Sequence, residues 1–273
     1  MKTAGRIYAA LMYLFLYSPL VVMIIYSFNA KRSTSVLSFD YAGEKYSFGH
    51  WYREVFEGGG ALVPLRNSLI LALTCAVVTT ILGTLAAYGL HHLKIRYLKN
   101  AINSVTSIPM MNPDIVTGIS MMLLFATAFS IAGFGQTGFV TLLIAHVTFS
   151  LPYTILSITP RLRQMDKNLP EAALDLGCTP IQSFFKVQLP FLFPAILSGF
   201  IMAFTLSLDD YVISLFTAGA SFETLPLYIY SMARRSVPPT IYAVSTLFLV
   251  LVLVLLILSN VIQSKTLGDE KQN

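Results

Sequence analysis

The chain has 273 residues, of which 55% are hydrophobic and only 11% are charged. Soluble domains carry roughly 25% charged residues, so this composition argues against a soluble globular protein. It also excludes a disordered one, because disorder requires low hydrophobicity. The net charge of +5 could indicate nucleic-acid binding. The basic residues lie at the ends of apolar runs, however, so we interpret them as membrane-orienting and lipid-contacting, and expect no nucleic-acid partner.

Long uncharged stretches predict the membrane-spanning helices. A helix needs about 20 apolar residues to cross a bilayer. The stretch 101–160 holds a single charge, is long enough for two spans, and has a glycine-rich turn at 133–138. The six predicted spans cover about 7–28, 67–90, 103–132, 138–158, 190–217 and 240–262. Because these runs are apolar on every face, helices are favoured over barrel strands. We expect an all-α integral membrane protein whose single transmembrane domain covers 1–273.

The first span could be mistaken for a secretory signal, since Lys2 and Arg6 precede it. Its uncharged run covers residues 7–29. This is longer than a typical signal core, which has roughly 7–15 residues. No small-x-small cleavage site follows it directly. We therefore expect a retained helix rather than a cleaved leader.

The distribution of basic residues predicts the orientation. With the N-terminus inside, the inner segments hold 11 of the 18 Lys and Arg residues, and the outer segments hold the rest. Cytoplasmic segments are enriched in Lys and Arg. Because the number of spans is even, both termini are predicted to be cytoplasmic.

Metal, disulfide and nucleotide sites are not expected in this chain. Cys75 falls within a predicted span and Cys178 in an inner segment, and the four histidines lack metal-ligand spacing. The chain also has no Gly-x-x-x-x-Gly-Lys-Ser/Thr loop. It is therefore not expected to bind ATP. We also expect no other bound cofactor and no enzymatic activity of its own.

The inner segment 161–189 carries the strongest local signals. Asn168 suits a helix N-cap, Pro170 the first turn, and Gly177 the position just after a helix. Thr179 and the following proline start a second short helix. Its apolar face holds Ile181, Phe184 and Phe185. We expect a helix–Gly–helix element suited to docking in a groove of another protein.

This segment resembles a known motif. Glu-Ala-Ala, three residues, Gly, nine residues, Ile, one residue and Leu-Pro is the EAA motif of binding-protein-dependent ABC importer permeases. Its positions here are Glu171, Ala172, Ala173, Gly177, Val187, Leu189 and Pro190, with Val187 in place of the usual Ile. The resemblance implies a type I (MetI-like) importer fold, with the motif forming a coupling helix that seats in a cleft of a cytoplasmic ATPase subunit. The residues expected to couple to the ATPase are Glu171, Ala172, Ala173, Gly177, Ile181, Phe184 and Phe185.

Three further stretches, at 110–116, at 204–212 and at 225–232 followed by 237–239, resemble the C-type permease subunits of the spermidine/putrescine group. Asn112 stands where Ser is usual, and a Pro-Pro pair follows Val237 where one Pro is usual. The closer resemblance implies polyamine import across a bacterial inner membrane by alternating access. It also implies a second homologous permease subunit, an ATPase dimer that holds ATP and Mg²⁺, and an extracytoplasmic polyamine-binding protein.

Three carboxylates lie in or at the edge of predicted spans: Asp114, Asp209 and Asp210. A charge inside a bilayer is costly and usually faces a wet cavity or the bundle interior. Polyamines are multiply charged and largely aliphatic, so spaced carboxylates with aromatic walls would suit them. The predicted substrate path therefore holds these three residues together with Phe204 and Tyr211.

Other roles for the same carboxylates stay open. Pro109 and Pro113 are expected to break the third span, so Asp114 could simply cap its second half. Adjacent residues on a helix point about 100° apart. One of Asp209 and Asp210 could therefore face the path while the other caps, or pairs with an arginine at 234–235.

Rival functional classes are weaker. An intramembrane aspartyl protease would need Gly-x-Gly-Asp, whereas Ser207 and Leu208 precede Asp209. A secondary carrier often has two similar halves, and no internal repeat is visible. Within the ABC class, the alternative is a different solute, such as an anion or another cationic metabolite.

Overall fold

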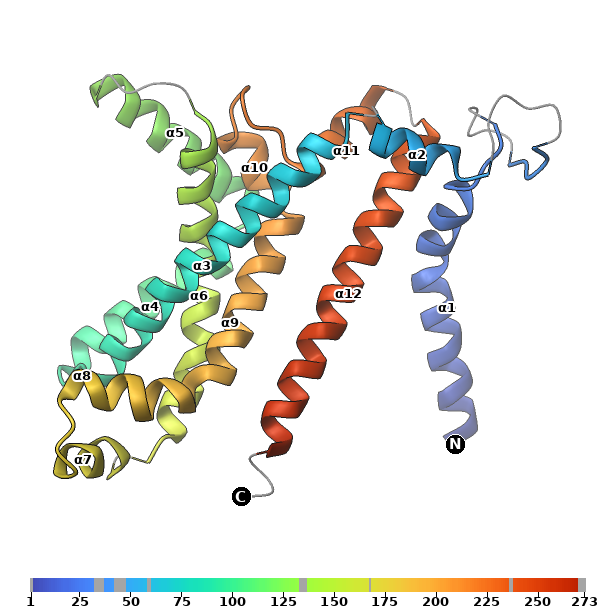
Figure 1. Ribbon diagram of the computed structural model, residues 1–273. Coiled ribbons are helices and arrows are strands. Elements are labelled where there is room, and N and C mark those ends of the chain that lie inside the picture. The colour runs from blue at the N-terminus through green and yellow to red at the C-terminus, as the bar shows by residue number, and fades with distance from the viewer. Residues whose placement is uncertain are drawn as a thin grey trace. The chain divides into compact units, whose positions relative to one another are not determined.

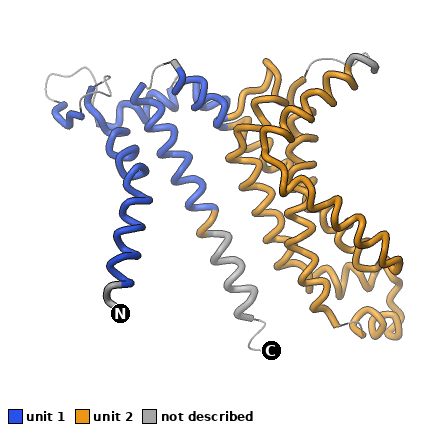
Figure 2. Tube along the Cα trace, turned by 180° about the vertical axis from the view of Figure 1, so that it is seen from behind, with its two compact units in different colours: residues 1–65, 225–255 blue, residues 66–224, 256–273 orange. Residues whose placement is uncertain are grey.

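The computed structural model of the chain describes residues 2–31, 37–41, 48–57, 60–132, 137–166, 168–235 and 238–269. Every regular element among these residues is a helix. Two compact units share the chain (Figure 2). The first comprises residues 1–65 and 225–255, and the second comprises residues 66–224 and 256–273.

The helices follow one another in the order labelled in Figure 1. They are α1 (Lys2–Tyr26), α2 (His50–Glu57), α3 (Leu62–His92), α4 (Arg96–Met111), α5 (Asp114–Ala132), α6 (Phe139–Gln164), α7 (Asn168–Asp175), α8 (Pro180–Ser183), the π-helix η1 (Phe184–Gln188), α9 (Leu189–Asp209), α10 (Val212–Thr217), α11 (Leu225–Arg235) and α12 (Pro239–Asp269).

Five helical stretches among the described residues are long and apolar enough to cross a membrane. They are Gly5–Tyr26, Leu62–His92, Phe139–Gln164, Pro180–Asp209 and Pro239–Ile257. The pair α4 and α5 qualifies when it is taken as one broken span, which brings the number to six. The prediction of an all-α membrane protein is confirmed, and the predicted six spans correspond to these six segments.

The third span is broken as its prolines predict. The axes of α4 and α5 differ by 106° across a break of a few residues. Asn112, which precedes Pro113, has an extended backbone with ψ of 140°. Proline lacks an N–H and disfavours a helical conformation in the residue before it. Asp114 is then the first residue of α5.

The fifth span differs from its predicted range of 190–217. Its helix ends at Asp209, Asp210 is extended with ψ of 125°, and the short α10 begins separately at Val212. No proline or glycine marks this break. His146 of α6 contacts residues on both sides of it.

The same span also begins earlier than predicted, because the second short helix of the EAA segment (defined here as residues 168–190) runs on into it. The Leu189 N–H donates to the Phe184 carbonyl, which makes one π turn over Phe184–Gln188. Pro190 has no N–H and its ring would crowd the Lys186 carbonyl in a regular α-helix. The wider π turn relieves that crowding. The second helix of the predicted helix–Gly–helix element is therefore continuous with the membrane span.

Helices α3, α6 and α9 of the second unit approach closely at Thr154. A Cβ added to Gly83 of α3 would lie 2.7 Å from Thr154 Cγ2, and one added to Gly199 of α9 would lie 2.9 Å from the same atom. Small residues at such crossings let membrane helices pack by van der Waals contact. Nearby, a cluster of Ala87, Ile155, Ile158, Leu162 and Leu192 is buried.

The first unit has its own core around α2 and α12. Trp51 and Val55 of α2 pack with Ala243 and Val244 of α12. The Trp51 indole N–H donates to the Asn29 carbonyl at 2.7 Å. This hydrogen bond satisfies the N–H group of the buried indole.

Candidate functional site

The break between α9 and α10 is built around the carboxylate of Asp210. One of its oxygens accepts from the Ile213 N–H at 3.2 Å, and the other accepts from the Ser214 N–H at 2.7 Å. The first N–H groups of a helix have no partner within the helix. Asp210 therefore caps α10, where a negative charge is also favoured.

Asp210 also meets His146, which comes from α6. The two side chains are 8% and 2% exposed, and His146 Nε2 lies 3.4 Å from Asp210 Oδ2. The same nitrogen lies 3.1 Å from Ser214 Oγ, and Nδ1 lies 2.8 Å from Ser207 Oγ. These four residues form the His146 cluster. It ties α6 to the end of α9, to the break and to α10.

Asp209 and Asp210 thus have different surroundings. Asp209 is the last residue of α9 and its side chain is exposed. Of the alternatives that the sequence left open for Asp210, the structure favours capping, and the ionisable side chain beside its carboxylate is His146, at 3.4 Å. The aromatic residues expected beside the path are half-buried at Tyr211 and Phe204, and the Phe204 ring stacks on Phe200 at a centroid distance of 6.5 Å.

Asp114 lies exposed at the start of α5. Gly118, one turn further on, packs against α10, since an added Cβ there would lie 2.7 Å from a Phe216 ring carbon. Residues four apart share a helix face. Asp114 therefore lies on the face of α5 that contacts α10. A role for it in a substrate path stays a prediction.

In the EAA segment, the first helix ends as predicted at Gly177. This residue has a φ of +87°, a conformation that glycine adopts at no steric cost. Its N–H donates to the Leu174 carbonyl at 2.9 Å, and the Cys178 N–H donates to the Ala173 carbonyl at 3.0 Å. This pair of bonds is a Schellman motif. At the other end of the helix, Asp166 provides a capping carboxylate, which accepts from the Asn168 N–H at 2.9 Å.

The second helix begins with a capping box. Thr179 Oγ1 accepts from the Gln182 N–H at 3.3 Å, and Gln182 Oε1 accepts from the Thr179 N–H at 3.0 Å. The Ser183 hydroxyl then donates to the Pro170 carbonyl at 3.4 Å, which ties the two short helices together. They lie beside each other at the lower left of Figure 1.

The predicted coupling residues divide into two sets. An outer set is exposed and consists of Glu171, Ala172, Gly177, Ile181 and Phe185. Ile181 is 70% exposed and the neighbouring Leu176 is 87% exposed. Ala173 is instead buried, and Phe184 packs edge-on against the Tyr88 ring of α3 at 4.9 Å. The outer set therefore combines exposed apolar side chains, chiefly Ile181 and Phe185, with the charged Glu171.

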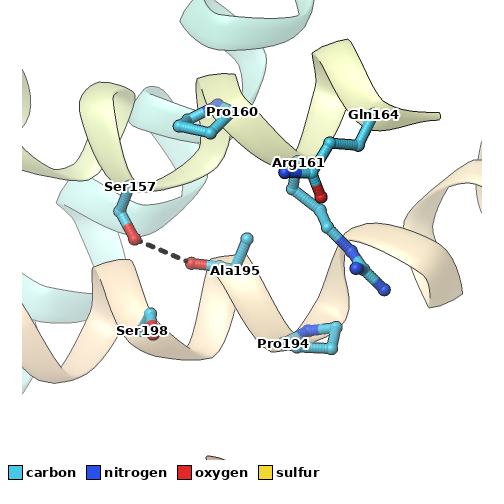
Figure 3. A pocket seen from close by; sticks show the side chains of 7 residues that line it. All are labelled: Ser157, Pro160, Arg161, Gln164, Pro194, Ala195 and Ser198. Carbon is cyan, nitrogen blue, oxygen red and sulfur yellow. Dashed lines mark hydrogen bonds between the residues drawn. The ribbon is translucent and has the colours of Figure 1, made fainter. Parts of the chain in front are cut away.

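A pocket that the sequence did not indicate lies between α6 and α9 (Figure 3). It has a volume of about 260 Å³ and is lined by Ser157, Pro160, Arg161, Gln164, Pro194, Ala195 and Ser198. The Ser157 hydroxyl donates to the Ala195 carbonyl at 3.2 Å. Arg161 donates to the Phe191 carbonyl at 3.2 Å and stacks on the Phe191 ring at 4.2 Å. The pocket carries no grouping of His, Cys or carboxylate side chains.

Comparison with known proteins identifies relatives over most of the chain. Residues 79–267 match the family model described as binding-protein-dependent transport system inner membrane component. The chain is 39% identical over 236 residues to the putrescine transport system permease protein PotI of Escherichia coli (strain K12), covering 86% of this chain and 82% of that protein. It is 37% identical over 253 residues to the spermidine/putrescine transport system permease protein PotC of Haemophilus influenzae, covering 93% of each.

A solved structure shares the fold. A bacterial ABC transporter involved in the import of the acidic polysaccharide alginate superimposes with a TM-score of 0.74, covering 97% of this chain and 96% of that chain at 14% identity. At that identity the likeness concerns architecture alone, in agreement with the type I importer fold that the EAA motif implied.

Proposed function

Since the chain belongs to the family of binding-protein-dependent transport system inner membrane components, we propose that it is the permease subunit through which an ATP-driven importer moves polyamines. The observation that carries the proposal is the similarity, over most of both chains, to permeases named for putrescine and for spermidine/putrescine. Spermidine and putrescine are therefore the first solutes to test.

The exposed end of α9 has chemistry that suits such a solute. A polyamine needs negative charges for its amines and apolar or aromatic surface for its methylene chains. Asp209 supplies an exposed carboxylate, and Tyr211 and Phe204 supply partly accessible rings beside it. A single exposed carboxylate binds a cation only weakly. High-affinity capture would then belong to the extracytoplasmic binding protein.

The outer set of the EAA segment suits the predicted partner. An exposed apolar surface on short, rigid helices can seat in a groove of another protein. We propose that this groove lies on a cytoplasmic ATPase dimer, which binds ATP and Mg²⁺, and that a second homologous permease subunit completes the translocation path. Both termini then lie in the cytoplasm.

The fusion of the EAA segment to α9 provides a mechanical link. Helical structure is continuous from Pro180 to Asp209 through the π turn, with a bend between α8 and α9 (Figure 1), so one helical segment of 30 residues joins the docking surface to the carboxylate. Movement of the ATPase subunits upon ATP binding would move this helical segment. The end at Asp209 would move with it, as alternating access requires.

Reconstituted transport tests the proposal. The full complex in proteoliposomes, with ATP inside and the binding protein outside, is expected to accumulate radiolabelled spermidine or putrescine but not arginine. Asp209→Asn should lower this uptake several-fold because it removes the exposed charge, whereas Glu57→Gln, at an exposed acid of the first unit, should not. ATP-dependent uptake of a non-polyamine solute, with no uptake of either polyamine, would overturn the assignment.

A further inference from the structure

We propose that His146 is a positioning residue: it holds Asp210 as the cap of α10, and so leaves Asp209 as the carboxylate of this pair that meets the solute. The cation-binding half of this inference rests on the proposed polyamine function. The positioning half rests on the geometry of the His146 cluster alone.

The cluster lies across an interruption of a helix. Ser207 precedes the break, Asp210 is in it and Ser214 follows it, and all three contact one imidazole at 2.8, 3.4 and 3.1 Å. An imidazole has nitrogens on two edges of its ring, so it can interact with both sides of the break at once. A shorter or apolar side chain on α6 would contact neither side with hydrogen bonds.

The break itself depends on the Asp210 carboxylate. Because the backbone is extended at this residue, the N–H groups at the start of α10 lose the carbonyl partners that a continuous helix would provide. Asp210 accepts from two of them, at Ile213 and Ser214. A buried carboxylate is stable only when its charge is compensated. Among the described residues, the ionisable side chain recorded within ion-pair distance of it is His146.

This arrangement assigns different tasks to two adjacent acids of the same type. Three contacts, from the Ile213 N–H, the Ser214 N–H and the His146 imidazole, bind Asp210 into the protein, so its carboxylate is not available to a passing cation without dismantling the cap. Asp209 is exposed at the end of α9. Asp209 takes its direction from α9, of which it is the last residue, and His146 acts on it indirectly, by holding Ser207 of the same turn and the break that ends the helix.

The test combines transport kinetics with a double-mutant cycle on the full complex. His146→Ala is expected to raise the KM for spermidine about tenfold and to change the maximum rate less, because it disturbs the orientation of a binding group. Asp209→Ala should also raise KM. Adding His146→Ala to Asp209→Ala should then change KM little further, since the group that His146 positions is already gone.

Thermal unfolding of the same purified complexes supplies a readout that needs no solute. His146→Ala and Asp210→Ala are expected to be coupled, with the double variant no less stable than the worse single variant, whereas His146→Ala and Asp209→Ala should be additive. If the His146→Ala complex does not assemble, the same double-mutant cycle is measured with His146→Gln, which keeps an N–H donor.

The outcomes separate the two ideas. Additive stability effects of His146 and Asp210 would overturn the positioning role, as would a KM that rises with Asp210→Ala and not with Asp209→Ala. Failure of the unmodified complex to transport any polyamine would instead overturn the proposed function and the cation-binding role of Asp209. The stability cycle would still decide whether His146 holds the cap.

Discussion

The crossing of α3, α6 and α9 makes a sharp prediction for Gly83. In Gly83→Ala, the new methyl group would lie 2.7 Å from Thr154 Cγ2 and 3.0 Å from Thr154 Cβ. Comfortable carbon–carbon separations are roughly 3.5–4.0 Å, so the two helices must separate or Thr154 must move by about 1 Å. Thr154 cannot retreat easily, because Gly199 already confines its Cγ2 on the α9 side.

Overpacking of this kind typically costs about 1–3 kcal/mol. Taking about 2 kcal/mol, the midpoint of thermal unfolding should fall by roughly 4–8 °C for a chain of this size. The measurement is thermal unfolding of the purified complex in nanodiscs. Gly89→Ala is the matched control, because it lies on the same helix and an added Cβ meets nothing within 4 Å.

A second variant isolates the cause. Thr154→Ser removes the methyl group that Gly83→Ala would strike, and keeps the hydroxyl that donates to the Ser150 carbonyl at 3.4 Å. The double variant should therefore be more stable than Gly83→Ala alone. Equal midpoints for Gly83→Ala and Gly89→Ala, or no rescue by Thr154→Ser, would show that these helices do not pack as described.

The other predictions concern the EAA segment and the core of the first unit. Gly177→Ala should destabilise the turn by about 1–2 kcal/mol, because the φ of +87° strains any side chain. It should weaken co-purification of the ATPase, and Gly177→Asn should do so less. Ile181→Asp should abolish that co-purification without lowering the melting temperature, whereas Phe184→Ala should lower the melting temperature because its ring is packed inward. If Ile181→Asp and Phe184→Ala lowered the melting temperature equally, that would contradict an outward-facing Ile181 and an inward-packed Phe184. Trp51→Phe should cost about 1 kcal/mol in thermal unfolding through loss of the indole bond to the Asn29 carbonyl, and an unchanged midpoint would count against that bond.

Features with local causes were predictable from the sequence. Membrane residence follows from missing charges, the break before Asp114 from the chemistry of Pro113, and the end of α7 from a glycine. Each depends on a few neighbouring residues, so no knowledge of distant contacts was required.

The end of α9 was not predictable in this way. The sequence around Asp209 is apolar on one side and lacks proline and glycine, so a continuous helix to 217 was the natural prediction. The break is stabilised by His146, which is far away in the chain and to which the sequence suggested no role. Likewise, nothing local distinguishes Phe184 from Phe185. Phe184 differs because its ring packs against Tyr88 of α3, which is distant in the sequence.

The π turn at Phe184–Gln188 has a consequence for changes in chain length. A π turn is an α-helix carrying one residue too many, so losing one residue there can restore ordinary α geometry while the flanking helices keep their rotational phase. The same deletion inside α9 would rotate everything beyond it by about 100° and turn Asp209 to another side. Loss of one residue at this turn should therefore change the direction of Asp209 less than the same loss inside α9, and its cost should be the return of the Pro190 ring against the carbonyl of the preceding turn.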